Sequence, residues 1–337
     1  MRYALLVSPS TNRVYAQSAA ALAVAELQVV SAQVLGGALS DIQQQTLGSV
    51  AYVTFSAPDL DELARSWLSN LAATFALFAV DDAGKLTPLD LQRWDQLDSD
   101  LISIQKYAGK TNEAFTKLLF NVTLAASAFG SASATERRPL AVLDPLCGRG
   151  TTLNQALMYG CHATGVEVDK KDFEAYSLFI QRWVKDHRLK HTAVQGSVKG
   201  HPKLDLELGA SKELFKSGDT QRITYVSADT HAIAQVFQPR SFDLIVTDAP
   251  YGVQHGAQTG GAIARKPLEL LTSAIPVWRA ALRPGGAIGI AWNTLVARRE
   301  KLAQLLAENG LKVCDFPVTF EHRVDTSIQR DLIVARA

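Results

Sequence analysis

The sequence predicts an α/β protein with two units: a small N-terminal α/β domain followed by a larger, doubly wound domain with a mostly parallel sheet. Three observations support this prediction. The net charge is −6 over residues 1–100 and +7 over residues 101–337. The first 80 residues carry strand and helix patterns in the order β-α-β-β-α-β, whereas the rest alternates buried apolar runs with amphipathic segments. A glycine-rich turn follows the first strand of the second unit, where such domains bind ligands.

Bulk composition bounds the class of protein. Of the 337 residues, 47% are hydrophobic and 20% are charged, and the net charge is +1, which excludes a disordered acidic chain or a uniformly basic one. The three cysteines, Cys147, Cys161 and Cys314, form no C-x-x-C pair, so we expect neither disulfides nor a bound metal. No run approaches the roughly 18 to 20 apolar residues of a membrane span. We therefore expect a soluble, cytoplasmic protein without a membrane partner.

The N-terminal unit is expected to span residues 1–85. Strand patterns occur at residues 3–7, 32–35, 50–55 and 75–80, and helical patterns occur at residues 19–30 and after Pro58. This order is typical of a ferredoxin-like split βαβ fold. Residues 86–106 are rich in aspartate and contain Pro88, so they are expected to form a linker to a second domain over residues 107–337.

The second unit begins with a helical pattern capped by Thr111 or Asn112, and then a short apolar strand that ends at Asp144. Gly148 and Gly150 follow and lead into a helix. Glycines let the backbone turn tightly and approach a ligand, and the helix N-terminus behind them offers free N–H groups. A carboxylate at the tip of the strand would attract a cationic group such as an α-ammonium.

Acidic residues follow the next two strands as well. Glu167 and Asp169 end the second strand, where a carboxylate can accept hydrogen bonds from ribose hydroxyls, and Glu167 is favoured because it leaves the strand first. Asp229 follows the third strand, where it would either accept from an adenine amine or cap the next helix. The turn lacks the third glycine of G-x-G-x-x-G, which disfavours a nicotinamide cofactor and leaves an adenosyl cofactor.

A fourth strand ends in Asp248, Ala249, Pro250 and Tyr251. The order of motifs in this unit resembles class I S-adenosylmethionine-dependent RNA methylases, and is most similar to tRNA guanine-N2 methyltransferases. The resemblance covers about residues 105–337. It rests on three segments: Tyr107-Ala108-Gly109-Lys110-Thr111-Asn112, Asp144-Pro145-x-Cys147-Gly148-x-Gly150-Thr151, and Thr247-Asp248-x-Pro250-Tyr251-Gly252-Val253.

The resemblance implies a Rossmann-like class I methyltransferase fold, with a mostly parallel seven-stranded sheet, and S-adenosylmethionine as cofactor. It also implies two sets of site residues. The cofactor set is Thr111, Asp144, Cys147, Gly148, Gly150, Glu167, Asp229 and Asp248, and the set at the target base is Asp248, Ala249, Pro250 and Tyr251. Ala249 stands where the family has the first proline of D-P-P-Y, and the N-terminal unit is shorter than the usual pairing with a THUMP RNA-binding domain.

The residue types of this loop suit methylation of an amine. An exocyclic purine amine is a weak nucleophile because its lone pair is delocalised into the ring. If the Asp248 carboxylate and the Ala249 carbonyl accepted its two N–H bonds, they would orient it toward the methyl donor. Tyr251 offers a flat face for a base swung out of its stack. Cys147 is expected to pack as a small buried group, and His231, His255 and His322 as surface or satisfied histidines.

A basic stretch points to an RNA partner. It lies in an expected insertion at residues 187–220, together with the end of the preceding helix, and it could contact phosphates or be a solvated helix end and loop. Its basic residues are Arg182, Lys185, Arg188, Lys190, Lys199 and Lys203. The expected activity is methylation of an RNA amine, guanine N2 in tRNA. The alternatives are a DNA or small-molecule amine methyltransferase and a non-catalytic cofactor-binding scaffold.

Overall fold

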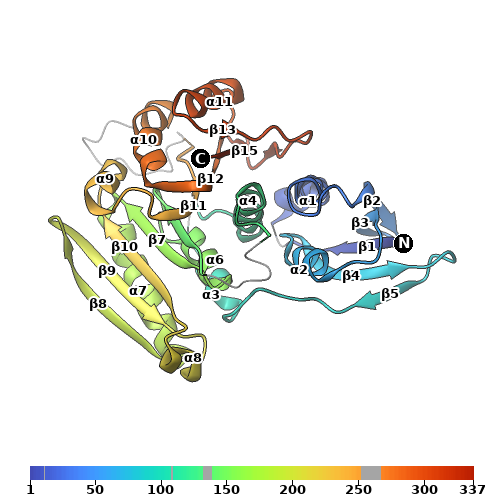
Figure 1. Ribbon diagram of the computed structural model, residues 1–337, viewed down its shortest axis with the longest axis horizontal. Coiled ribbons are helices and arrows are strands. Elements are labelled where there is room, and N and C mark those ends of the chain that lie inside the picture. The colour runs from blue at the N-terminus through green and yellow to red at the C-terminus, as the bar shows by residue number, and fades with distance from the viewer. Residues whose placement is uncertain (11, 108, 132–138, 252–266) are drawn as a thin grey trace.

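The computed structural model describes residues 1–10, 12–107, 109–131, 139–251 and 267–337. These residues form two units with one sheet each, and the N-terminal unit lies against one side of the larger C-terminal unit (Figure 1). The sheet of the first unit has five strands and that of the second has ten. The chain therefore has the two α/β units that its charge and periodicity predict.

The N-terminal unit has the expected β-α-β-β-α-β order, and its strands lie in the order β2-β3-β1-β4-β5 with antiparallel pairing throughout. This is the strand order of a ferredoxin-like fold with one strand added. Two expectations were wrong in detail. The first concerns residues 32–35, which belong to the end of the first helix and the following turn rather than to a strand. The elements are β1 (Arg2–Val7), α1 (Arg13–Gln33), β2 (Ser40–Leu47), β3 (Val50–Ser56), α2 (Glu62–Asn70) and β4 (Thr74–Val80).

The second wrong detail concerns the expected linker at residues 86–106. Its first residues form β5 (Leu86–Leu89), which pairs with β4 and belongs to the N-terminal sheet. A short helix, α3 (Asp100–Ser103), lies near its end. Between them, the side chain of Asn70 donates to the Gln92 carbonyl at 2.7 Å and accepts from the Trp94 N–H at 2.9 Å. Hydrogen bonds thus hold the connection against the first unit.

Helix α1 joins the two units. Asn12 caps it by accepting from the N–H groups of Val14 and Tyr15 at 3.1 Å each. Residues Val14–Gln33 are long and apolar enough to cross a membrane, but 61% of their most apolar window is buried inside the protein, and core helices share this composition. The helix packs between its own sheet and α4 of the second unit (Figure 1). Its apolar character is therefore explained by two-sided burial.

The C-terminal sheet contains the expected mostly parallel seven-stranded arrangement. The order β10-β7-β6-β11-β12-β15-β13 runs through its centre, with parallel pairing from β10 to β12 and antiparallel pairing to β15. The strands of this unit are β6 (Ala141–Asp144), β7 (His162–Glu167), β8 (His191–Val198), β9 (His201–Leu208), β10 (Gln221–Ser227), β11 (Phe242–Asp248), β12 (Leu282–Asn293), β13 (Lys312–Val313), β14 (His322–Arg323) and β15 (Gln329–Arg336).

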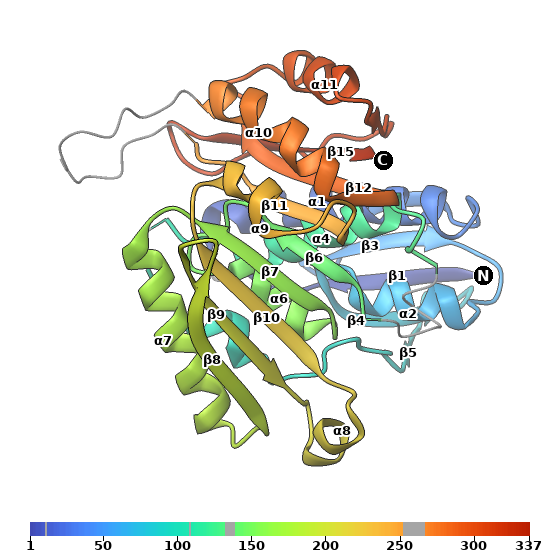
Figure 2. The ribbon, with the colours of Figure 1, turned by 60° about the vertical axis from the view of Figure 1, so that its left-hand side comes forward.

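Helices cover both faces of this sheet, which gives it two apolar cores (Figure 2). One core also contains the packing of the N-terminal unit, and the other is closed by α10 and α11. Burial on both faces explains the continuous apolar runs of strands such as β11. The helices are α4 (Glu113–Ala126), α6 (Thr151–Met158), α7 (Lys170–Asp186), α8 (Lys212–Ser217), η1 (Thr230–Ala232), α9 (Ile233–Val236), α10 (Pro267–Ala281) and α11 (Arg299–Glu308).

The expected insertion at residues 187–220 extends the sheet. Strands β8 and β9 form a hairpin that pairs with β10, and α8 leads back into the fold. The hairpin turn consists of Lys199 and Gly200, both with positive φ (51° and 86°), as a tight two-residue turn requires. Because Lys203 is the register partner of Val226 near the end of β10, the turn projects at the carboxyl edge of the sheet.

Candidate active site

The carboxyl edge of the parallel strands gathers the acidic residues that the sequence singled out. Asp144 ends β6, Glu167 ends β7 and Asp248 ends β11, while Asp229 follows β10 by two residues. Parallel strands place their carboxyl ends at one edge, where open α/β sheets bind ligands. The structure therefore brings these four carboxylates to the edge at which a cofactor and an acceptor would meet.

The glycine turn between β6 and α6 is packed on one side and open on the other. Gly150 has φ +76°, and a Cβ there would lie 2.4 Å from the Tyr176 ring, so only glycine fits. Gly148 has φ +50°, but a Cβ there would meet nothing within 4 Å. The Tyr225 hydroxyl donates to the Gly148 carbonyl at 2.7 Å and helps to hold the turn in place. The backbone at Gly148 thus faces open space in which a ligand can approach it.

Glu167 braces this turn. Its Oε2 accepts from the Gly148 N–H and its Oε1 from the Asp169 N–H, each at 2.8 Å. Burial raises the pKa of the Glu167 carboxyl above its ordinary value. Each carboxylate oxygen has a second lone pair, so both can still accept from a diol. Asp169 is exposed and caps α7 by accepting from the Lys171 N–H, which favours Glu167 over Asp169 as the ribose ligand.

Asp144 differs from its expected orientation. It was expected to face the crevice, but it is only 3% exposed, because its Oδ1 accepts from the Thr247 hydroxyl at 2.8 Å and from the Leu146 N–H at 3.1 Å. Burial raises the pKa of this carboxyl to about 7. Asp144 therefore ties the glycine turn to the end of β11, and its contact with an ammonium group remains a prediction.

Asp229 and Cys147 have local partners. Asp229 caps η1 by accepting from the His231 N–H at 2.9 Å, and it also pairs with the His231 ring, whose Nε2 lies 2.8 Å from the Ser273 hydroxyl. Cys147 is buried, and its thiol donates to the Val166 carbonyl at 3.4 Å. The capping that the sequence left open for Asp229 is thus present, while its contact with adenine stays a prediction.

Asp248 is the centre of a compact polar cluster. Its Oδ2 accepts from the Thr111 hydroxyl at 2.5 Å, and its Oδ1 accepts from the Tyr251 hydroxyl. The Arg330 guanidinium lies 3.9 Å from the same carboxylate. Thr111 was expected to bind the cofactor, but the structure places its hydroxyl on Asp248. Asn112, rather than Thr111, caps α4. Two hydroxyl donors therefore hold the Asp248 carboxylate in one orientation, and the Arg330 guanidinium lies beside it.

The loop after Asp248 is anchored by its backbone. The Ala249 N–H donates to the Ala291 carbonyl at 2.8 Å, which extends the pairing of β11 and β12 by one residue. A proline at this position could not make that bond, so the alanine replaces proline rigidity with a hydrogen bond. Ala249 is buried and Pro250 is exposed. The motif residues Ala108, Gly252 and Val253, as well as His255, lie outside the described part of the chain.

Tyr251 is less open than a stacking platform requires. Its ring lies 5.0 Å from the Arg330 guanidinium, and Asn293 donates to its backbone carbonyl at 3.3 Å. Burial and the neighbouring Asp248 carboxylate raise the pKa of the Tyr251 hydroxyl well above its ordinary value, so Tyr251 stays a donor. The described structure thus shows Tyr251 positioning Asp248, whereas stacking on a base remains a prediction.

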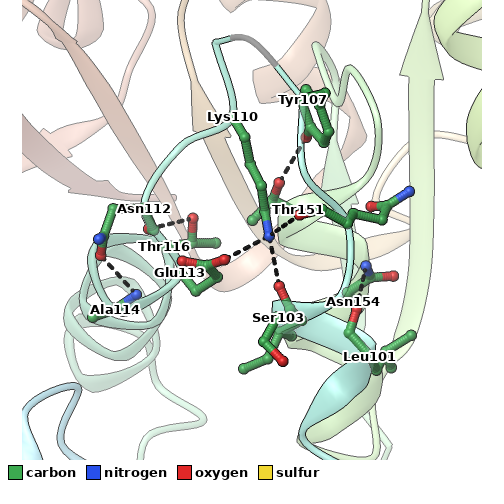
Figure 3. A network of polar contacts seen from close by, with 12 residues as sticks. Leu101, Ser103, Tyr107, Lys110, Asn112, Glu113, Ala114, Thr116, Thr151 and Asn154 are labelled. Atoms are coloured by element: carbon green, nitrogen blue, oxygen red, sulfur yellow. Dashed lines mark hydrogen bonds and ion pairs between the residues drawn. The ribbon is translucent and has the colours of Figure 1, made fainter. Parts of the chain in front are cut away.

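The segment that carries Thr111 is fixed by Lys110. The ammonium group of Lys110 donates to the carbonyls of Ile102 and Gln105 and to the Glu113 carboxylate, at 2.7, 2.9 and 2.5 Å (Figure 3). Nearby, Tyr107 and Thr151 join their hydroxyls at 3.1 Å, which ties the same segment to the start of α6. The hydrogen bonds of Lys110 therefore hold this segment in place and position Thr111.

Two residues near Asp248 were not identified from the sequence as site residues. Arg330 lies on β15, about 80 positions after Asp248, and no motif marks it. His322 was expected to be a surface or satisfied histidine, yet it is 4% exposed and lies 5.0 Å from the Phe115 ring. Their proximity depends on the antiparallel return of β15 next to β12, which no local sequence signal reveals.

A cavity of about 500 Å³ lies elsewhere, between the two units. It adjoins Leu140 and Cys161, which precede β6 and β7, and hence the amino ends of these strands. Near α3, Asp98, Asp100 and His187 bring possible metal-ligand atoms within 4.8 Å of one another, but His187 already pairs with Asp100 at 3.1 Å. Neither feature adjoins the glycine turn or Asp248, so neither belongs to this site.

The residues present fit S-adenosylmethionine. The open side of the turn at Gly148 can admit a ligand against the backbone, and Glu167 keeps free lone pairs for ribose hydroxyls. The Asp248 cluster lies at the adjoining strand end, joined to the turn through Thr247 and Asp144. Fold and site together define a class I S-adenosylmethionine-dependent methyltransferase.

Comparison with known proteins agrees with this class. Residues 114–271 match the model of the UPF0020 family, described as an RMKL-like methyltransferase domain. No curated protein matches the chain.

Three methyltransferases are among the solved structures to which this chain is similar. They are the 1,6-didemethyltoxoflavin-N1-methyltransferase of Burkholderia thailandensis (15% identity, 63% of this chain and 78% of that one, TM-score 0.36), the ribosomal protein L11 methylase of Lactobacillus delbrueckii subsp. bulgaricus (16%, 66% and 79%, 0.36), and the magnesium protoporphyrin IX methyltransferase of Synechocystis PCC 6803 (12%, 68% and 89%, 0.38). The similarity is low in each case.

Proposed function

We propose that the protein methylates an exocyclic amine of an RNA base, and that the amine is N2 of guanine in tRNA. The observation that carries this proposal is the Asp248 cluster: a carboxylate at the end of β11, held by the hydroxyls of Thr111 and Tyr251, with the Ala249 backbone beside it. This arrangement offers two acceptors in sequence to an amine that must present its lone pair.

The residues of the chain can orient the amine in this way. Hydrogen bonds from both amine N–H groups, one to Asp248 and one to the Ala249 carbonyl, leave only the lone pair to point at the reacting carbon. The bound cofactor supplies a methyl group on a positively charged sulfur. The donors from Thr111 and Tyr251 hold the Asp248 carboxylate still, so little reorganisation is needed when the amine arrives. The proton that the amine loses can pass to the Asp248 carboxylate or to solvent.

The position of the hairpin supports contact with RNA by part of the basic stretch. Lys199 and Lys203 lie at the carboxyl edge, whereas Arg188 and Lys190 lie between the end of α7 and the start of β8, at the opposite edge. Eight-residue strands separate the two groups by roughly 25 Å. We therefore assign the proposed phosphate contact to the hairpin turn rather than to the whole stretch.

Nucleoside mass spectrometry of RNA from cells with and without the gene tests this proposal. We expect one methylated guanosine, N2-methylguanosine, to disappear from the tRNA fraction when the gene is removed, and to return with the wild-type chain but not with an Asp248→Asn variant. Unchanged RNA nucleosides would contradict the proposal. A lost methyl mark in DNA, or on a small amine, would identify the alternative substrates, and loss of none would favour a non-catalytic scaffold.

A further inference from the structure

Arg330 is a buried cation beside the Asp248 cluster. It lies on β15 and is 4% exposed. Its guanidinium lies between two rings, 4.6 Å from that of Phe115 and 5.0 Å from that of Tyr251. A terminal nitrogen of Arg330 lies 3.9 Å from Oδ2 of Asp248. The rings attract a guanidinium without carrying a net charge, so Asp248 is its counter-ion within the part of the chain that the structure describes.

The position of this charge is fixed by the sheet. Strand β15 pairs on one side with β12, where Arg330 is the register partner of Asn293, and on the other side with β14, where its partner is His322. The two rings then hold the side chain between them. These contacts do not involve a substrate, so the charge is in place before a substrate binds.

The described structure brings titratable groups from several elements to Asp248. Burial raises the pKa of the Tyr251 hydroxyl, on the same loop, well above its ordinary value, and burial lowers the pKa of the His322 ring on β14, so both groups are neutral at neutral pH. Asp144, at the end of β6, is a second carboxyl, and burial raises its pKa to about 7. Among these groups only Arg330 carries a positive charge that can offset the charge of Asp248.

The charge of Asp248 decides what it can do to an amine. Its side chain is only 18% exposed. A carboxylate that loses its counter-charge in such surroundings tends to take up a proton. A protonated carboxyl would donate to the amine nitrogen and occupy the lone pair that has to attack the methyl group. Only the ionised form can accept from the amine and leave that lone pair free.

We propose that Arg330 is a positioning residue for the reaction: its fixed charge keeps Asp248 an anionic acceptor at neutral pH. This inference rests on the proposed function. Arg330 acts through Asp248, so its role requires no contact with the substrate. The proposal predicts that loss of the Arg330 charge has an effect that depends on pH, whereas loss of a merely structural residue has the same effect at every pH.

The first test compares Arg330→Met with wild type in the methylation of a tRNA transcript from about pH 6 to about pH 9. An arginine charge beside a carboxyl favours the ionised form by a factor of about ten or more. We therefore expect the ratio of the variant's kcat/KM to that of wild type to rise at least about tenfold across this range. A constant ratio, whether equal to one or below it, would overturn the inference.

Other titrations do not produce this result. Groups that titrate alike in both proteins, such as Asp144, cancel in the ratio. The Arg330 charge lowers the pKa of His322, so its removal lets His322 take up a proton more readily at low pH. The new positive charge would then partly replace that of Arg330, which makes the expected effect smaller rather than larger.

Two variants are matched controls. Arg330→Lys keeps the charge, and its ratio to wild type should change less than threefold over the same pH range. Arg336→Met removes an arginine that lies six positions further along β15, roughly 20 Å away, and that donates to Gln33, so its ratio should stay near one. A pH dependence in either control as large as in Arg330→Met would overturn the inference. Arg330→Gln, also uncharged, replaces Arg330→Met if that variant is unfolded.

The second test needs no substrate. At about pH 8, Arg330→Met should lower the urea midpoint of unfolding at least twice as much in the wild-type chain as in the Asp248→Asn background, because only a charged Asp248 is left without a counter-ion. Equal shifts would overturn the inference whatever the substrate is. If the shifts differ but wild-type protein methylates no RNA, the charge pairing stands and the proposed function is wrong.

Discussion

Two buried polar clusters of this protein are built differently. One lies between the units, where Glu26 of α1 accepts from the Ala72 N–H at 2.9 Å and from the Asn121 amide of α4 at 2.7 Å. Asn121 in turn donates to the Asn70 carbonyl at 2.8 Å and accepts from the Tyr159 hydroxyl at 3.0 Å. Every group of this cluster has a partner within the described chain, so it holds the two units together.

The other cluster surrounds Asp248. It also contains a carboxylate, here with two hydroxyl donors and a guanidinium 3.9 Å away, but Arg330 Nε and His322 Nε2 next to it lack partners within the described residues. Buried polar groups in folded proteins are nearly always satisfied, and exceptions call for an explanation. The difference indicates that the interface cluster serves stability, while the Asp248 cluster keeps hydrogen-bonding capacity for a ligand.

Removal of the Asp248 carboxylate is expected to have the largest effect, and it tests the role of the Asp248 cluster. We expect Asp248→Asn to lower kcat by about 10² to 10³-fold, as removal of a preorganised electrostatic group does. Calorimetry should find the affinity for S-adenosylmethionine within about threefold of wild type, since the glycine turn and Glu167 are intact. A variant with full activity would show that the loop is structural only.

At the interface, Asn121→Ala should affect stability instead. The change leaves Glu26 with fewer donors and Tyr159 without one acceptor, so we expect the free energy of unfolding to fall by about 2–4 kcal/mol. Urea denaturation measures this loss. At a temperature where the variant stays folded, kcat should equal that of wild type. A reduced kcat would show that the interface cluster also contributes to catalysis.

The pH dependence of stability tests the same cluster. Burial raises the pKa of Glu26 from 4.5 to about 7. The folded state therefore binds this proton more tightly than the unfolded state, and stability falls as the pH rises from about 4.5 to 7 and is level above that. We expect wild type to lose roughly 2–4 kcal/mol relative to Glu26→Gln across this window. Parallel curves for the two proteins would contradict the role of Glu26.

The cofactor end of the site gives a smaller expected effect. Glu167→Ala should weaken S-adenosylmethionine binding by about 1.5–3 kcal/mol, the range for a charged hydrogen bond. Asp169→Asn is the matched control, because asparagine can still cap α7 and the affinity should be unchanged. Calorimetry separates the two residues, and the opposite pattern would assign the ribose to Asp169.

The smallest expected effect concerns the hairpin. The paired changes Lys199→Ala and Lys203→Ala should reduce the slope of log affinity for tRNA against log salt by up to about one unit per lost contact. The control pair is Arg188→Ala and Lys190→Ala, which removes the same charge at the opposite edge and should leave the slope unchanged. Fluorescence anisotropy across a salt series measures both, and equal slopes in all proteins would remove the hairpin from the RNA site.

The fold could be predicted from the sequence because its signals are local. Strand periodicity and the turn at Gly148 and Gly150 are visible in short windows, and the parallel strands place Asp144, Glu167 and Asp248 at one edge. The residues 32–35 were misread because β-branched and apolar residues at the end of α1 have the composition of a strand.

Orientation of side chains could not be predicted in the same way. Whether Asp144 faces the crevice depends on Thr247, about 100 positions away, and whether Thr111 meets the cofactor or Asp248 depends on loop packing. Arg330 and His322 reach the site only through the pairing of β15. Contacts between segments that are far apart in the chain produce no periodic pattern in the sequence, so they could not be predicted from it.

One measurement tests the central claim most directly: purified protein is incubated with unmodified tRNA and S-adenosylmethionine that carries a deuterated methyl group, and the nucleosides are analysed by mass spectrometry. We predict labelled N2-methylguanosine with wild type and at most about 1% of that amount with Asp248→Asn. Label on another nucleoside or on none with wild type, or equal label with both proteins, would contradict the account.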